Sequence, residues 1–139
     1  SRAVRGLGGT VDDPVERRNQ EIRATLLRRR RKFERLRGIL TDPAACAFHI
    51  VLTAERLPVL ESIELYDDLT SNSISVPDLV VNRRSPADAG EFMASRRAVE
   101  DSALALLDSQ LPDVPCVELP WLPGEIGTRA ALAAIAERL

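Results

Sequence analysis

The sequence has few of the residues that nucleotide-cleaving and metal-dependent enzymes commonly use. Lysine occurs once in the 139 residues, as Lys32, which follows an arginine. A phosphate-binding loop of the GxxxxGK[ST] type needs a lysine that follows glycine, so the sequence contains no such loop. The chain has one histidine, His49, and two cysteines, Cys46 and Cys116, which form no CxxC pair. These residues supply neither a His/Cys zinc site nor a Ser/His/Asp or Cys/His nucleophile.

Long apolar runs are also missing. No run approaches the roughly 20 residues that cross a bilayer, and no stretch resembles a signal peptide. We therefore expect a cytoplasmic protein in which both cysteines are reduced, buried thiols. His49 lies inside the apolar run 47–53, where a lone histidine is expected to be a neutral packing residue.

Charge is distributed unevenly along the chain. Residues 1–40 carry 12 basic and 5 acidic side chains, whereas residues 41–139 carry 7 basic and 16 acidic ones. The basic part could be an arm for nucleic acid or an anionic membrane, or could hold against the acidic remainder of the domain or a neighbouring subunit. The run Arg28–Lys32 spreads around a helix, and a solvated surface is its default interpretation. No nucleic-acid motif or interleaved aromatic residue accompanies the run, so we expect no nucleic-acid partner.

The order of helical and strand patterns predicts an α/β fold. Residues 1–11 have no periodic pattern and are expected to form a linker or loop. The expected elements after them are a helix at 12–40, a strand at 47–53, a helix at 57–71, a strand from 79, a helix from 85 to about 112, a strand at 115–119 and a helix at 128–139. Four helices alternating with three strands favour a parallel sheet.

The apolar positions predict which side chains face the core. The run 47–53 is continuously apolar and fits a strand covered on both faces. Each of the first three helices is expected to have one apolar face. The positions are Ile22, Leu26, Phe33, Leu36 and Ile39 or Leu40 in the first, Leu60, Ile63, Tyr66 or Asp67, and Leu69 or Thr70 in the second, and Phe92, Val99, Ala103, Leu106 or Leu107, and Leu111 in the third. A parallel sheet of only three strands leaves an exposed edge, so the chain is predicted to be one half of a larger fold.

Asn82 is the first candidate for a ligand-binding residue. It follows the apolar run Leu79–Val81 and precedes Arg83 and Arg84. Ligands of open α/β sheets bind at the carboxyl ends of strands, which favours a ligand-facing Asn82. Asparagine is also common after strands for turn formation alone, so both interpretations stay open.

The sequence resembles the carboxyl-terminal half of proteins of the ArsA family. This family comprises the arsenite-pump ATPases and the related ATPases that target tail-anchored membrane proteins. The resemblance covers roughly residues 25–139. The segments that carry it, in order, are Asp42-Pro43 followed by a strand with Phe48, the stretch Val51–Glu61 with Glu55 and Leu57 in register, Val81-Asn82-Arg83, Arg96-Arg97 and Val117–Gly127.

The resemblance implies a partial P-loop-NTPase-type three-layer fold at residues 12–139 and a role around the adenine ring of ATP. The residues placed there are Asn82, Arg83, Leu119, Pro120, Trp121 and Leu122. Packing in the core is the alternative role for Trp121. ATP with magnesium is implied for the intact protein, with magnesium and the catalytic residues in an amino-terminal half outside this segment, so the segment alone is expected not to hydrolyse ATP.

The resemblance also implies partners: the amino-terminal half of the ATPase or a second subunit, a homodimer or heterodimer, and a membrane-protein client, in the cytoplasm or peripheral to the inner membrane. Two departures favour a bacterial type. Residues 86–95 lack the CxxC of the eukaryotic targeting ATPases, so zinc-linked dimerisation is not expected, and no apolar helical insert suited to a transmembrane segment is visible. A third departure is that the family's arginine three residues after its glutamate is Glu64 here, so the ion pair of that arginine is not expected. The competing hypothesis is a non-catalytic interaction module that docks a partner through its basic first helix.

Overall fold

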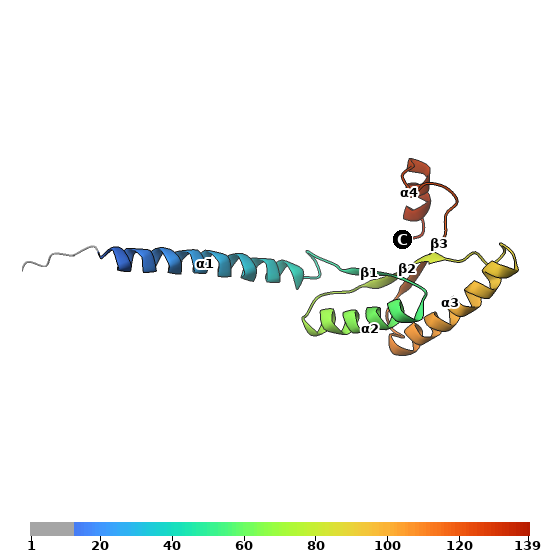
Figure 1. Ribbon diagram of the computed structural model, residues 1–139, viewed down its shortest axis with the longest axis horizontal. Coiled ribbons are helices and arrows are strands. Elements are labelled where there is room, and N and C mark those ends of the chain that lie inside the picture. The colour runs from blue at the N-terminus through green and yellow to red at the C-terminus, as the bar shows by residue number, and fades with distance from the viewer. Residues whose placement is uncertain (1–12) are drawn as a thin grey trace, which may run out of the picture. The chain divides into compact units, whose positions relative to one another are not determined.

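The computed structural model describes residues 13–139 of the chain, so the predicted linker at 1–11 lies outside the described residues. Seven elements follow one another (Figure 1): α1 at Pro14–Leu40, β1 at His49–Thr53, α2 at Arg56–Ser71, β2 at Asp78–Arg84, α3 at Glu91–Gln110, β3 at Cys116–Pro120 and α4 at Arg129–Ala136. The chain divides into two compact units, of which the first ends at Gly38 and the second is Ile39–Leu139.

The described part of the first unit is α1 up to Gly38. Asp13 caps this helix, since its carboxylate accepts a hydrogen bond from the Val15 N–H at 3.0 Å, and Pro14 occupies the first turn, where a missing N–H costs nothing. The helix ends at Leu40, where the helix predicted at 12–40 also ends. None of its side chains is buried, so the apolar face predicted for this helix exists but is exposed.

The second unit is built on a three-stranded parallel sheet in the order β1-β2-β3. In the register His49 lies opposite Asp78, Thr53 opposite Asn82, and Leu79 opposite Cys116. Because parallel neighbours need a crossover, α2 connects β1 to β2, and α3 connects β2 to β3. The predicted fold class, three parallel strands alternating with four helices, is confirmed.

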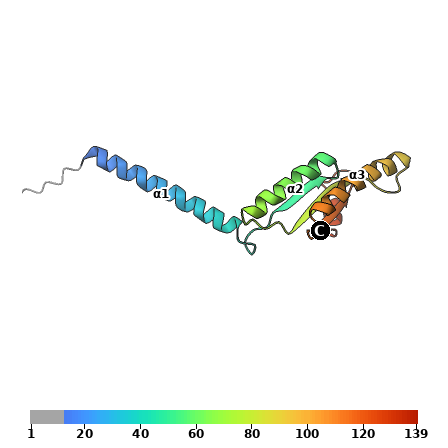
Figure 2. The same ribbon diagram turned by 90° about the horizontal axis from the view of Figure 1, so that it is seen from below.

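One face of the sheet carries the core. Helices α2 and α3 run side by side across this face, and α4 lies on the other side of the sheet (Figures 1 and 2). The buried apolar side chains of the core come from β1, β2, α2, α3 and the residues that flank β1 and β2: Ile50, Leu52, Ala54, Val59, Val76, Leu79, Val81, Ala103 and Leu107. Of the three most deeply buried, Leu79 and Val81 come from the central strand β2 and Val59 comes from α2, so β2 is held firmly up to its carboxyl end.

Several predicted burials are wrong. In β1 only alternate residues are buried, and Val51 is 61% exposed, so this strand is covered on one face instead of two. His49 is exposed as well, and its Nδ1 lies 2.6 Å from the Asp78 carboxylate. The sequence pattern could not show this, because an apolar strand is equally suited to a face that another polypeptide covers.

The cysteines and two helices also differ from the expectations. Both thiols are free, but Cys46 is only half-buried and Cys116 is exposed. Phe92 and Val99 of α3 and Leu60 of α2 are exposed instead of packed in the core. Helix α3 begins at Glu91 and not at 85, since Gly90, with φ +95°, redirects the chain into the helix and most residues avoid that conformation.

Candidate functional site

A groove of about 500 Å³ opens at the carboxyl ends of β1 and β2. The strand side contributes Thr53, Asn82 and Arg83, and α2 contributes the carboxylate of Glu61 and the hydroxyl of Ser62. The remaining lining residues are apolar: Ile50, Val51, Leu52, Pro58 and Leu65. The groove therefore combines an apolar wall with a few polar groups, as small-molecule sites usually do.

An irregularity in β2 turns Asn82 and Arg83 out of the ladder with β3. Val81 pairs with Glu118 and Arg84 with Pro120, so the two residues between them have no partner in β3. Arg83 has φ +58°, an uncommon value for a residue other than glycine. Such bulges often re-aim side chains next to binding sites. Here the bulge directs Asn82 and Arg83 to the groove, and β2 continues to Arg84 instead of ending at Val81 as predicted.

The amide of Asn82 retains unused hydrogen-bonding capacity. Its Oδ1 accepts the Arg83 N–H at 2.9 Å, which fixes the side-chain direction. Within residues 13–139 its Nδ2 donates no hydrogen bond. An amide group with free donors at the carboxyl end of a central strand is suited to a hydrogen-bonding ligand.

Trp121 lies under the guanidinium of Arg83. The Arg83 Cζ lies 5.5 Å from the centre of the indole ring, within cation–π range. Trp121 is 53% exposed, so it is not packed in the core of this chain. Its backbone N–H donates to the Arg84 carbonyl at 3.0 Å, which ties the segment after β3 to the end of β2.

Trp121 itself does not line the groove, and neither do the other three predicted site residues, which are its neighbours in the chain. Leu119 and Pro120 are the last residues of β3, and Leu122 follows Trp121; all three are half-buried. Asn82 and Arg83 thus line the same groove, Trp121 contacts Arg83 beside it, and the other three residues only neighbour Trp121 in the chain.

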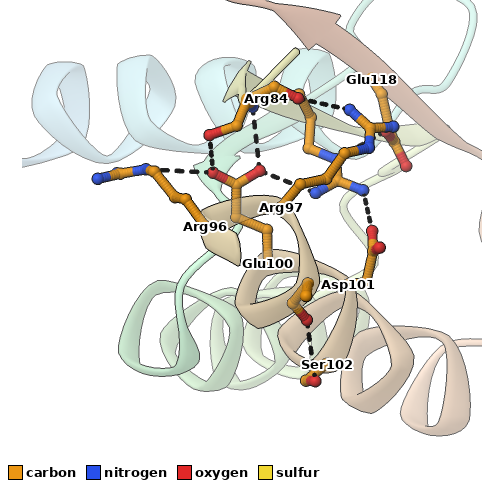
Figure 3. Close-up of polar contacts among 9 residues, drawn as sticks. Arg84, Arg96, Arg97, Glu100, Asp101, Ser102 and Glu118 are labelled. Carbon is orange, nitrogen blue, oxygen red and sulfur yellow. Dashed lines mark hydrogen bonds and ion pairs between the residues drawn. The ribbon is translucent and has the colours of Figure 1, made fainter. Parts of the chain in front are cut away.

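Next to the groove, a buried ion network anchors the end of β2 (Figure 3). Arg84, 3% exposed, donates to the Glu118 carboxylate of β3 and the Glu100 carboxylate of α3, both at 2.8 Å, and also to Asp101. Arg97 of α3 donates to the Ser85 carbonyl at 2.6 Å. Arg84 therefore links β2, α3 and β3 at the point where Asn82 and Arg83 leave the ladder.

Glu100 is the buried centre of the acidic side of this network. It is 4% exposed, and it accepts the Ser85 hydroxyl at 2.6 Å and the Ser85 N–H at 3.0 Å. Burial by itself would raise the pKa of Glu100, but the Ser85 bonds and Arg84 outweigh it and hold this pKa below its ordinary value. Burial likewise opposes the charge of Arg84, and its three carboxylate partners still hold the pKa above the ordinary value.

The sequence analysis missed this network. Its signal is that Glu100, Ala103 and Leu107 share one buried face of α3 at helical spacing. A carboxylate on the core face of a helix needs a buried cationic partner, and the doublet Arg83-Arg84 ending an apolar strand offers one. Which of the two arginines turns inward depends on the bulge, which the sequence does not display.

The network predicts acid sensitivity of the second unit. The stabilisation from a carboxyl with a lowered native pKa is complete above its unfolded pKa of about 4.3 and is lost as the pH falls through the native value. We expect the free energy of unfolding to fall steeply below about pH 4.3 in the unmodified chain, and less steeply in Glu100→Gln. Denaturant titrations at several pH values measure this. The exposed Glu91→Gln is the matched control and should keep the original slope; equal slopes for all three proteins would contradict the prediction.

Two features are absent from the part of the chain that the structure describes. Residues 13–139 contain no group of three or more His, Cys, Asp or Glu side chains arranged to hold a metal ion. No helix among these residues is both long and apolar enough to cross a membrane.

Comparison with known proteins gives a consistent match. The sequence model of the family described as "Anion-transporting ATPase" matches residues 5–139. "Protein Rv2184c" of Mycobacterium tuberculosis is 35% identical over 123 residues, which are 78% of this chain and 29% of that protein. "Putative arsenical pump-driving ATPase 2" of Aquifex aeolicus is 25% identical over 140 residues, covering 90% of this chain and 46% of that protein.

A third relative is "ATPase asna-1" of Caenorhabditis elegans, 24% identical over 139 residues, with 95% of this chain and 38% of that protein covered. This chain thus spans less than half the length of each of these relatives. Because the family model matches nearly every residue of the sequence, the chain belongs to the anion-transporting ATPase (ArsA) family.

Proposed function

We propose that this chain forms the adenine-binding wall of an ATP site, with Asn82, Arg83 and Trp121 as the contacting residues and Leu119, Pro120 and Leu122 as their support. The observation that carries the proposal is the bulge in β2, which turns Asn82 and Arg83 into the groove and places Arg83 over Trp121.

The chemistry of these side chains suits a purine base. An asparagine amide can donate to a ring nitrogen of adenine and accept from its exocyclic amino group. An exposed indole offers a flat apolar surface for stacking, and the Arg83 guanidinium adds a positive charge beside it. Arg84 is a positioning residue and does not contact the base. Its bonds to the carboxylates of Glu118 and Glu100 hold the strand from which Asn82 projects.

Phosphate binding, magnesium and hydrolysis are proposed to reside in the remainder of a longer ATPase. The only lysine in the sequence is exposed in α1, and residues 13–139 offer no cluster of metal ligands. The relatives include two proteins named as ATPases, each more than twice the length of the matched region. ATP and magnesium are therefore proposed as cofactors of that longer protein.

The edges of the three-stranded sheet suggest that another polypeptide completes it. The order β1-β2-β3 leaves β1 and β3 as edge strands, and Val51 exposes an apolar side chain on the face opposite the core. Exposed edges of parallel strands are normally paired or covered. We propose that the amino-terminal half of the ATPase, or a second subunit, covers them, in a homodimer or heterodimer located in the cytoplasm or peripheral to the inner membrane and serving a membrane-protein client.

The adenine site predicts a response of Trp121, the only tryptophan in the sequence. Titration with ATP should change its fluorescence with weak affinity, about millimolar, because this chain supplies no phosphate loop. Asn82→Ala should weaken binding by about five- to tenfold through loss of the amide hydrogen bonds. Asn72→Ala, at the carboxyl end of α2, is the matched control and should leave binding unchanged.

UTP at the same concentrations separates base recognition from attraction of Arg83 to phosphate, since it carries the same triphosphate. A smaller response to UTP than to ATP supports the adenine site. No ATP response up to about 10 mM, or equal effects of ATP and UTP, would contradict the proposal and favour the interaction-module hypothesis.

A further inference from the structure

Helix α1 carries an apolar stripe that follows a heptad repeat. Val15, Ile22, Leu26, Phe33 and Leu36 are separated by seven, four, seven and three residues, which places Leu26 and Phe33 at a positions and the other three at d positions. Each of them is between 50% and 70% exposed. Exposed apolar stripes of this length mark interaction surfaces, and this set is called the α1 seam below.

Two polar residues occupy the same repeat. Asn19 takes an a position between Val15 and Ile22, and Arg29 takes a d position between Leu26 and Phe33. Polar residues at single core positions of coiled coils fix register and choice of partner at some cost in stability. Arg29 also specifies the partner chemistry, because a cation inside an apolar seam needs an acidic neighbour.

The positions that flank the α1 seam are strongly basic. The e and g positions hold Arg18, Arg23, Arg30, Lys32 and Arg37 against a single acidic residue, Glu16. Arg30 also forms an exposed pair with Glu34 of the same helix at 2.8 Å, an arrangement that contributes little. A second copy of α1 would place like charges opposite each other along both flanks, in parallel or antiparallel orientation.

We propose that the α1 seam docks an amphipathic helix of another protein, one whose apolar a and d residues are flanked by Asp and Glu. Charge complementarity selects this partner, and the basic flanks exclude self-pairing. An anionic membrane surface fits less well, because a helix lying in a bilayer interface keeps its apolar face free of charge, whereas Arg29 stands in the middle of the α1 seam. The proposal is independent of the adenine site.

The test uses the full chain and a labelled synthetic peptide of four heptads with Ile at a, Leu at d and Glu at e and g, whose own like charges oppose self-assembly. Fluorescence anisotropy should show binding that weakens severalfold when NaCl rises from about 50 to 500 mM. Leu26→Glu should weaken binding at least about tenfold, because it buries a charge in the seam.

Leu27→Glu is the matched control. It adds the same charge one residue further along, at a b position outside the α1 seam, where the leucine is 51% exposed, and it should leave binding within about twofold. The same peptide with Lys in place of Glu at e and g should not bind. Equal binding of the two peptides, equal losses in the two leucine variants, or binding to phosphatidylserine vesicles without binding to the acidic peptide would overturn the proposal.

Discussion

Replacing Arg84 by methionine is expected to lower the free energy of unfolding of the second unit by about 3–5 kcal/mol. The cause is the carboxylate left behind: Glu100 is 4% exposed and would keep only the Ser85 bonds and its 3.4 Å contact with Arg96. Its charge would then be buried without its closest cation. Urea or guanidinium denaturation curves of the two proteins measure the difference.

The neighbouring arginine provides the control. Arg83 lies on the same strand but is exposed, so Arg83→Met should cost no more than about 1 kcal/mol, the range of an exposed cation–π pair. The double variant Arg84→Met with Glu100→Gln should recover part of the loss, since it removes the unpaired charge. Similar small effects of Arg84→Met and Arg83→Met would show that the network does not anchor β2.

Replacing Leu79 by alanine is expected to cost about 2–5 kcal/mol. Leu79 is 1% exposed in the central strand, among the most deeply buried side chains of the core, so its truncation leaves a cavity that neither helix can fill. Thermal or denaturant unfolding checks the value. A large loss would also reduce ATP binding indirectly, because β2 carries Asn82.

Leu57→Ala is the matched control for this substitution. Leu57 lies in α2 and is 64% exposed, so its truncation should change stability by no more than about 0.5 kcal/mol. A comparable loss in the two leucine variants would mean that the α2 surface at Leu57 is buried in solution, and that another polypeptide or copy covers it.

The position of Asn82 in the candidate site could be predicted, because it depends only on the order of residues along the chain. Asn82 was placed at the carboxyl end of a buried strand because an apolar run ends there, and the structure puts it in a groove at that end. The grouping of Arg83 with Trp121 came from resemblance to the family, and the structure brings the two together. The opposite directions of Arg83 and Arg84 were not predictable, since they follow from a local register shift against β3.

The sequence by itself determined the elements of this protein and their order. Apolar periodicity, Asp13 and Pro14 at one helix start, and the helices between successive strands all act through neighbouring residues, so they predict a parallel α/β fold without tertiary information. Only the tertiary structure decided which apolar residues are buried. Val51, Phe92 and the α1 seam have the same pattern as core residues, yet they are exposed, because burial depends on what lies opposite a side chain and not on its own sequence.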